Sequence, residues 1–157
     1  MYLKKAAIVF LGSILLAGLV AAQTSDAVKL PDTAAGKTLS AFLAAFNTGN
    51  AAEILRWVYP DGRVTGTGTL PNGTGIRSES WTQFTQRASG SGFQESISDP
   101  AIEVDGDAAM IWAPFVVRVG GKVHNCGFDH FDLVRENGAW KVMNLTFSSR
   151  ITGCPAE

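Results

Sequence analysis

The sequence contains few of the side chains from which metal centres and hydrolytic triads are built. Its 157 residues include two cysteines and two histidines, and they contain no Gly-x-Ser-x-Gly segment, so a serine-hydrolase triad has no support. Three of these four side chains, His124, Cys126 and His130, lie in one short run. In an extended strand this run spreads over roughly 20 Å, because each residue rises about 3.3 Å. One ion cannot bind all three side chains, and we expect no metal site.

Basic residues are too few and too scattered for a nucleic-acid-binding surface. The formal net charge is -1, and no basic stripe is visible. We therefore expect neither nucleic acid nor an anionic membrane as a partner. The glycine- and threonine-rich segment 61–77 lacks the Gly-Lys-Ser/Thr ending of a P-loop, and we interpret it as two strands that turn at Asn72-Gly73. No cofactor is expected.

One long apolar run is present, and it lies at the N-terminus. Lys4 and Lys5 precede the run, which ends in small residues at Ala22. This pattern predicts a signal peptide over residues 1–22, and the alternative is a retained anchor helix. Cleavage after Ala22 would remove both lysines and change the formal net charge from -1 to -3. We expect the mature protein to be secreted or periplasmic.

The two cysteines, Cys126 and Cys154, would meet an oxidising compartment after export. We expect them to form one disulfide that ties the C-terminal tail to the strand containing Cys126. The alternative is two inert thiols.

A leader over residues 23–37 precedes three segments with helical periodicity. In the first, 37–50, apolar residues recur at the spacing of one helical face, and Gly49 ends the helix. Asn50 is a suitable N-cap for the second, 51–58, and Ser80 with Gln83 forms a capping box for the third, 78–88. The residues expected to face inward are Leu39, Phe42, Leu43, Phe46, Ile54, Leu55, Val58, Trp81, Phe84 and Ala88.

From Gly92 onward the apolar residues alternate with a period of two, as in β-strands. Turn signals at Asp105-Gly106-Asp107, Gly120-Gly121 and Asn137-Gly138 separate the strand-like runs. Helices followed by antiparallel hairpins predict an α+β fold in which the helices cover one face of the sheet. The expected strands are 92–98, 101–104, 108–119, 122–135 and 139–149.

Two-residue turns at Gly120-Gly121 and Asn137-Gly138 would place Phe115 opposite Cys126 and Asp129 opposite Thr146. The same registers pair Val117 with His124, Asp132 with Met143, and Phe131 with Asn144. Alternation then predicts one set facing the helices: Trp112, Val116, Val123, Asn125, Asp129, Phe131, Leu133, Trp140, Val142, Asn144, Thr146 and Arg150. The set predicted to face away is Ile111, Phe115, Val117, His124, Cys126, Phe128, His130, Asp132, Met143, Leu145 and Phe147.

Apolar walls with a few polar groups on the helix-facing side are typical of a ligand cavity. The alternative is that these polar residues lie at a solvated end of the sheet. Asp129 is the candidate catalytic residue, acting as a general base if apolar burial raises its pKa. The candidate ligand-binding residues are Trp57, Trp81, Trp112, Asn125, Asp129, Phe131, Asn144 and Arg150.

The run "HNCGFDHFDLVR" followed by "GAWKV" resembles the NTF2-like superfamily, in particular its SnoaL-like and lumazine-binding-type members. The resemblance covers residues 38–154. It implies a cone of three helices closed on a curved antiparallel sheet, with an internal cavity and frequent homodimerisation through the sheet. Such members include dehydratases, isomerases and cyclases as well as binding proteins, so the fold alone does not define the function.

Three functions remain open. We favour an exported domain that binds a small, largely apolar and neutral or weakly polar molecule in an aromatic-lined cavity. The enzyme alternative is a lyase or isomerase that uses Asp129, although the helices offer no acidic residue to the cavity. The third is a dimerising scaffold without a ligand.

Overall fold

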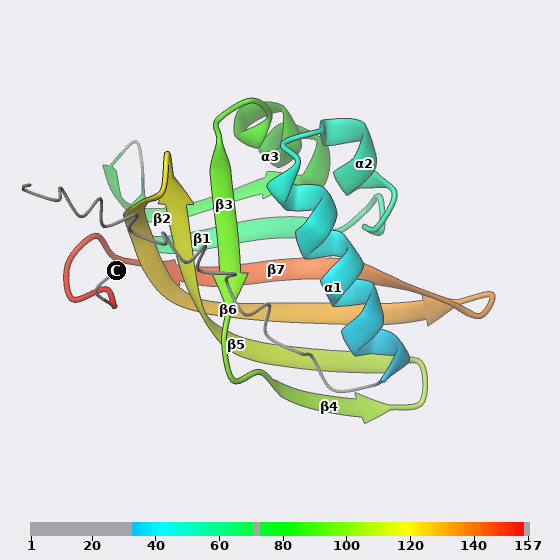
Figure 1. Cartoon of the computed structure of the whole chain (residues 1–157). Helices are drawn as coiled ribbons and strands as arrows, with labels where there is room; N and C mark the ends of the chain where they lie inside the picture. Colours follow the sequence, from blue (N-terminus) through cyan, green and yellow to red (C-terminus); the bar gives the residue numbers. More distant parts are fainter. Residues whose placement is uncertain (1–32, 71–72, 156–157) are drawn as a thin grey trace, which may run out of the picture.

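The computed structural model describes residues 33–70 and 73–155. In this part of the chain, helices lie against one face of a strongly curved sheet, which confirms the expected α+β fold (Figure 1). The predicted signal peptide lies outside the described residues. The helices are α1 (Ala34–Asn47), α2 (Ala51–Leu55) and α3 (Trp81–Ala88). The strands are β1 (Arg63–Leu70), β2 (Gly73–Ser80), β3 (Phe93–Ile97), β4 (Ala101–Asp105), β5 (Ala108–Val119), β6 (Lys122–Glu136) and β7 (Ala139–Ser149).

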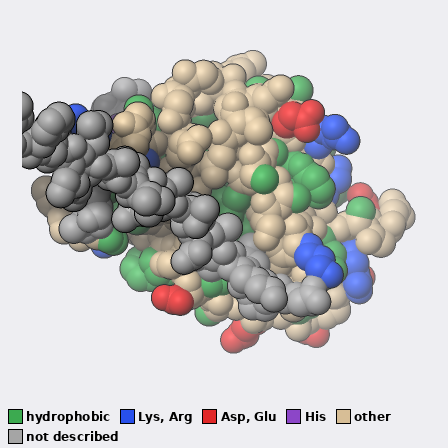
Figure 2. All heavy atoms as spheres, in the orientation of Figure 1, with side chains coloured by type: hydrophobic (Ala, Val, Ile, Leu, Met, Phe, Trp, Pro, Cys, Tyr) green, Lys and Arg blue, Asp and Glu red, His purple; other side chains and the backbone are tan. Residues whose placement is uncertain are grey.

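The sheet has the strand order β2-β1-β7-β6-β5-β3, and β4 also pairs with β5. All neighbours are antiparallel except β1 and β7, which pair in parallel. In Figure 1, α1 crosses in front of β7, β6 and β5. Figure 2 shows the same side of the molecule, where the visible acidic and basic side chains form no extended patch of one sign. On this side, α1 covers part of the long central strands β7, β6 and β5.

Local capping explains where the helices begin. The Asn50 side chain accepts hydrogen bonds from the Ala52 and Glu53 N–H groups, so α2 starts where the sequence predicts. Both halves of the capping box between Ser80 and Gln83 are present at α3. The first helix begins at Ala34, three residues before the expected segment, because Thr33 caps it. The second is shorter than predicted, since its α-helical part ends at Leu55.

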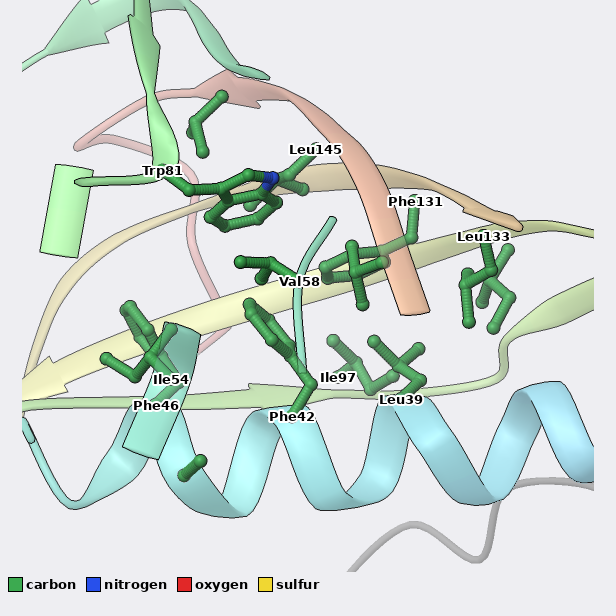
Figure 3. Close-up of a cluster of buried hydrophobic side chains, with 14 of the residues drawn as sticks. Leu39, Phe42, Phe46, Ile54, Val58, Trp81, Ile97, Phe131, Leu133 and Leu145 are labelled. Atoms are coloured by element: carbon green, nitrogen blue, oxygen red, sulfur yellow. The ribbon is translucent and has the colours of Figure 1, made fainter. Parts of the chain in front are cut away.

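The core forms where the apolar face of α1 meets the sheet. Phe42 is buried against Trp81 and Phe131, with ring centroids 5.5 and 5.9 Å apart. Figure 3 shows Leu39 and Phe42 rising from α1 toward the side chains of the strands. The indole nitrogen of Trp81 donates to the carbonyl oxygen of Met143 at 2.9 Å, so its one polar group is satisfied. Burial of these aromatic rings fixes α1 and α3 on one face of the sheet.

The observed strand registers differ from the predicted ones because of two β-bulges. The turns themselves are as expected, since Val119 pairs with Lys122 and Glu136 with Ala139. One extra residue enters β6 at His124, between the pairs of Arg118 and Val117, and another enters β7 at Met143. Each bulge moves the partner strand by one residue. The pairs observed beyond the bulges are Phe115 with Gly127, Val117 with Asn125, Asp132 with Asn144, Phe131 with Leu145, and Asp129 with Phe147.

The bulges also correct the predicted faces. Six residues lie on the helix-facing side as expected, namely Asn125, Asp129, Phe131, Leu133, Trp140 and Val142. Five residues that were predicted to face away lie on the same side, namely Ile111, Phe115, Val117, Leu145 and Phe147. In β5 the inward and outward side chains alternate in the opposite order to the prediction, so Trp112 and Val116 lie on the outer face. In β7 the bulge at Met143 inverts the faces, so Asn144 and Thr146 point outward.

The first hairpin also differs slightly from the expectation. Leu70 pairs with Gly73, so β1 and β2 connect through residues 71–72, one position before Asn72-Gly73. Those two residues lie outside the described part of the chain.

Candidate functional site

An aromatic-lined cavity of about 60 Å³ lies between the helices and the inner face of the sheet. Its walls are formed by rings from α1, α3 and three strands. The polar lining comes mainly from β3, β6 and β7. The aromatic residues are Phe46, Phe84, Phe93, Phe115 and Phe147, and the polar ones are Arg87, Glu95, His124, Asn125, Asp129 and Ser149.

Asp129 is a buried member of the cavity lining. It occupies the buried row of β6 with Phe131 and Leu133, and it is 1% exposed. Its Oδ2 atom is buried and has no hydrogen-bond partner among the described residues. Burial raises the pKa of the Asp129 carboxyl well above its ordinary value, and the nearby Glu95 charge raises it further. The raised pKa favours the protonated form of the carboxyl, which can donate a hydrogen bond.

Glu95 is the second carboxyl of the cavity, and the sequence analysis missed it. It lies on the inward row of β3 with Phe93 and Ile97. Burial raises the pKa of Glu95 to about 7. The available signal was the alternation itself, because a glutamate stands between two apolar residues at a spacing of two. Glu95 supplies the acidic group that no helix provides.

The bulge at His124 shapes the cavity mouth. His124 Nδ1 lies 2.8 Å from Asn125 Oδ1, and Asn125 Nδ2 donates to Ser149 Oγ at 3.2 Å. His124 was predicted to face away from the helices, and the bulge places it at the cavity rim instead. A larger hollow of about 300 Å³ adjoins the mouth and shares Leu70, His124, Asn125 and Ser149 with the cavity. The polar residues His124, Asn125 and Ser149 thus lie between the inner cavity and the outer hollow.

Arg87 is the basic residue of the cavity lining. Its guanidinium lies over the Phe84 ring, with Cζ 5.3 Å from the ring centroid, and forms an ion pair with Glu79. Both contacts hold the charged group in place at the wall. Arg87 was not among the residues predicted from the sequence, because its position on α3 gives no indication that β2 lies beside it.

The structure brings together only part of the predicted ligand-binding set. Asp129 and Asn125 line the cavity. Trp81 and Phe131 are buried in the adjoining core, and Trp57 is partly buried against that core. None of these three residues lines the cavity itself.

The other three members of the set lie elsewhere. Trp112 is 46% exposed on the outer face of the sheet, where it stacks on Phe128. Asn144 is on the same outer face, where it accepts from the Arg63 N–H and donates to Asp132. Arg150 is exposed, and its backbone forms two hydrogen bonds with Cys126. The prediction that these three residues face the helices is wrong, because the two bulges change the strand registers and the faces of the residues beyond them.

The predicted disulfide between Cys126 and Cys154 is present, with 5.6 Å between the Cα atoms. It joins β6 to the C-terminal tail next to the Cys126–Arg150 backbone bridge. Cys126 therefore carries no free thiol, and the tail residue Ile151 is held at the edge of the outer hollow.

The described residues contain no candidate metal site and no helix that could span a membrane. No group of three or more His, Cys, Asp or Glu side chains in residues 33–70 and 73–155 could hold a metal ion. No helix in the same residues is long and apolar enough to cross a membrane.

The chemistry that this arrangement allows is proton donation and acceptance in an apolar setting. A protonated Asp129 can donate to an oxygen atom, and Glu95 is close to half ionised at neutral pH. Two neighbouring carboxyls that resist simultaneous ionisation form a pair in which one holds a proton and the other can accept one.

Comparison with solved structures supports the fold. An NTF2-like protein with a cystatin-like fold from Novosphingobium aromaticivorans matches with a TM-score of 0.58 and 15% identity over 75% of this chain and 80% of that chain. A protein of Shewanella frigidimarina with the provisional name ketosteroid isomerase matches with a TM-score of 0.58 and 16% identity, over 74% and 96% of the two chains. A protein of Xanthomonas campestris, provisionally named a calcium/calmodulin-dependent protein kinase II association domain, matches with a TM-score of 0.60 and 19% identity, over 84% and 99%.

Comparison at the level of sequence defines the family. No protein of curated function matches the chain. The model of the SnoaL-like domain matches residues 32–146, which is more than half of the chain and includes both carboxyls of the cavity. Together with its fold, this match shows that the protein belongs to the SnoaL-like domain family of the NTF2-like superfamily.

Proposed function

We propose that the protein binds a small, largely apolar molecule in the aromatic cavity and holds it by a hydrogen bond from Asp129. The observation that carries this proposal is the buried Oδ2 atom of Asp129, which has no partner in the described part of the chain. A buried polar group without a partner costs free energy, about 1–3 kcal/mol. A ligand carbonyl or ether oxygen would accept the hydrogen bond and remove that cost.

The dimensions of the site limit the ligand. Cavities that enclose drug-sized ligands have volumes of about 300–1,000 Å³. The inner cavity of about 60 Å³ holds a few heavy atoms, whereas the outer hollow of about 300 Å³ can hold the rest of a larger molecule. We therefore expect one end of the ligand to reach Asp129 and the other to lie between His124 and Ile151.

Binding can be tested with 4-fluorophenylacetamide, a neutral aromatic amide, by titration followed with ¹⁹F NMR. We expect saturable binding to the wild type and about tenfold weaker binding to Asp129→Leu, which keeps the shape and removes the hydrogen bond. Asp132→Leu makes the same change on the outer face of β6 and should leave binding unchanged. Equal binding to all three proteins would refute a role for Asp129.

The second candidate function is proton transfer by a lyase or isomerase, and Glu95 is the observation that favours it. Since the raised pKa of Asp129 favours its protonated form, Glu95 would be the base that removes a proton beside a ligand carbonyl. Asp129 would donate to the carbonyl oxygen as negative charge develops there. This exchanges the roles expected from the sequence, in which Asp129 was the base.

This second function is tested by deuterium exchange at the α-carbons of cyclohexanone in D₂O. We expect exchange faster than in buffer, a loss in Glu95→Gln, and a rate that rises with pH as Glu95 ionises near pH 7. Glu103→Gln, on an exposed part of β4, should exchange as the wild type does. A wild-type rate equal to that of buffer would leave binding as the function.

Export remains part of the proposal. A disulfide is typical of proteins in oxidising compartments, and the Cys126–Cys154 bond is consistent with a signal peptide over residues 1–22. The mass of the protein recovered from its own host tests it, because cleavage would leave a chain that starts at Gln23.

We also propose that a second copy packs on the outer face of the sheet. Trp112, Phe128 and His130 form a cluster of rings there. The Trp112 ring stacks on Phe128, with centroids 5.3 Å apart, and the His130 ring is tilted against Trp112, with centroids 6.1 Å apart. A large exposed aromatic cluster on a sheet is typical of a protein interface.

A further inference from the structure

A second hollow, of about 30 Å³, adjoins the aromatic cavity over β1 and β2. The two share a wall, because Leu70, Arg87 and Phe147 line both. A ligand in the aromatic cavity is therefore close to the charged side chains of the second hollow as well as to Asp129. The complete lining of the second hollow is Val64, Gly66, Leu70, Arg77, Glu79, Arg87 and Phe147.

Two arginines from different elements, Arg77 on β2 and Arg87 on α3, line this hollow. Arg77 lies on β2 directly opposite Gly66 of β1, and Glu79 is two residues further along the same face. Gly66 has no side chain, and a Cβ atom there would lie 2.5 Å from the Phe147 ring. The ring thus lies close against β1, and Arg77 faces the same hollow as Arg87 from α3.

The charges at the hollow do not balance. Glu79 forms an ion pair with Arg87. Arg77 is partly buried, and its side chain forms no hydrogen bond or ion pair with any of the residues that the structure describes. Among the described residues, the guanidinium of Arg77 is therefore not neutralised by an ion pair. Its five N–H donors form a planar fork that matches the two oxygens of a carboxylate.

We infer that the ligand carries an anionic group, a carboxylate in the simplest case, which Arg77 binds with support from Arg87. The apolar part of the same molecule fills the aromatic cavity on the other side of Phe147. This inference rests on the proposed binding function and names its ligand class as small amphipathic carboxylic acids. It replaces the neutral ligand expected from the sequence, because the arginines assemble only when β2 and α3 meet.

The test compares 4-fluorophenylacetate with 4-fluorophenylacetamide, which have nearly the same shape and differ in charge. Titrations followed by ¹⁹F NMR at about pH 6 keep the acid ionised and Glu95 mostly protonated. We expect the wild type to bind the carboxylate about tenfold more tightly than the amide, since charge-assisted hydrogen bonds are about twice as strong as neutral ones. This preference should weaken as salt is added.

Two variants locate the effect. Arg77→Gln should bind both probes alike, with an unchanged affinity for the amide. Lys141→Gln makes the same change of charge near the other end of β7 and should keep the tenfold preference. A circular-dichroism spectrum of each variant confirms that it is folded.

The outcomes separate this inference from the function on which it rests. If the wild type binds both probes equally, or if Arg77→Gln keeps the preference, the anionic subsite is refuted and the binding function stands. If the wild type binds neither probe, the binding function and the subsite are both refuted.

Discussion

The side chain of Asn47 holds the backbone of Glu95 through two hydrogen bonds, although 48 residues separate them. Asn47 Nδ2 donates to the Glu95 carbonyl oxygen at 2.9 Å, and the Glu95 N–H donates to Asn47 Oδ1 at 2.7 Å. Asn47 is the last residue of α1, and Glu95 is the middle residue of β3. This contact ties the end of a helix to an edge strand and thereby positions the second carboxyl of the cavity.

Removal of that contact should lower the stability of the fold. We predict that Asn47→Ala reduces the free energy of unfolding by about 1–3 kcal/mol, because the Glu95 backbone groups are partly buried and lose both partners. Urea unfolding followed by circular dichroism measures the change. Gln94→Ala alters an exposed neighbour and should change the stability by less than about 0.5 kcal/mol. Equal effects of the two substitutions would contradict the role given to Asn47.

The two carboxyls should make the protein less stable as the pH rises. Because burial raises the pKa of Glu95 from 4.5 to about 7, the folded state binds more protons than the unfolded state between these values. Stability is therefore fully present below about pH 4.5 and declines as the pH rises through 7. Asp129, whose pKa is also raised by burial, adds to this decline. Melting temperatures measured across this range should fall. Glu95→Gln should flatten the decline, and an unchanged slope in this variant would assign it to other groups.

Loss of the disulfide should destabilise the protein without loss of the fold. The Cys126–Cys154 bond closes a loop with a sequence separation of 28, for which chain entropy predicts about 3–4 kcal/mol. The double substitution Cys126→Ala/Cys154→Ala should therefore lower the denaturation midpoint, and wild type treated with a reductant should show a similar decrease. A midpoint that stays the same in both samples would mean that the tail is held by the Cys126–Arg150 hydrogen bonds alone.

The outer aromatic patch should control self-association. Sedimentation velocity is expected to show a dimer for the wild type and a monomer for Trp112→Glu, because a charge at the centre of an apolar interface is costly to bury. The melting temperature of the monomer should change little, since Trp112 is 46% exposed. Val104→Glu, at an exposed site on β4, should stay dimeric. A monomeric wild type at high concentration would refute the proposed interface.

Several elements could be predicted because the interactions that define them are local in sequence. The N-caps of α2 and α3 depend on side chains within three residues of the helix start. The turns at Gly120-Gly121 and Asn137-Gly138 depend on residues that accept a positive φ. The inward direction of Asp129 was also correct, because it shares a strand and a period of two with Phe131 and Leu133.

The composition of the site could not be predicted in the same way. Glu95, Arg77 and Arg87 come from three different elements, and their meeting depends on how β3, β2 and α3 pack. No signal within a few residues of any of them indicates that meeting. Trp112 and Asn144 were assigned to the cavity because the strands were treated as regular.

The positions of the helices, the strands, the two glycine-containing turns and the disulfide partners follow from local sequence, because capping, periodicity and two lone cysteines leave few alternatives. Which side chains line the cavity depends on how the elements pack. A bulge at His124 or Met143 adds one residue to a strand and inverts every face beyond it, and the free energy that favours the bulge comes from packing against distant strands and helices.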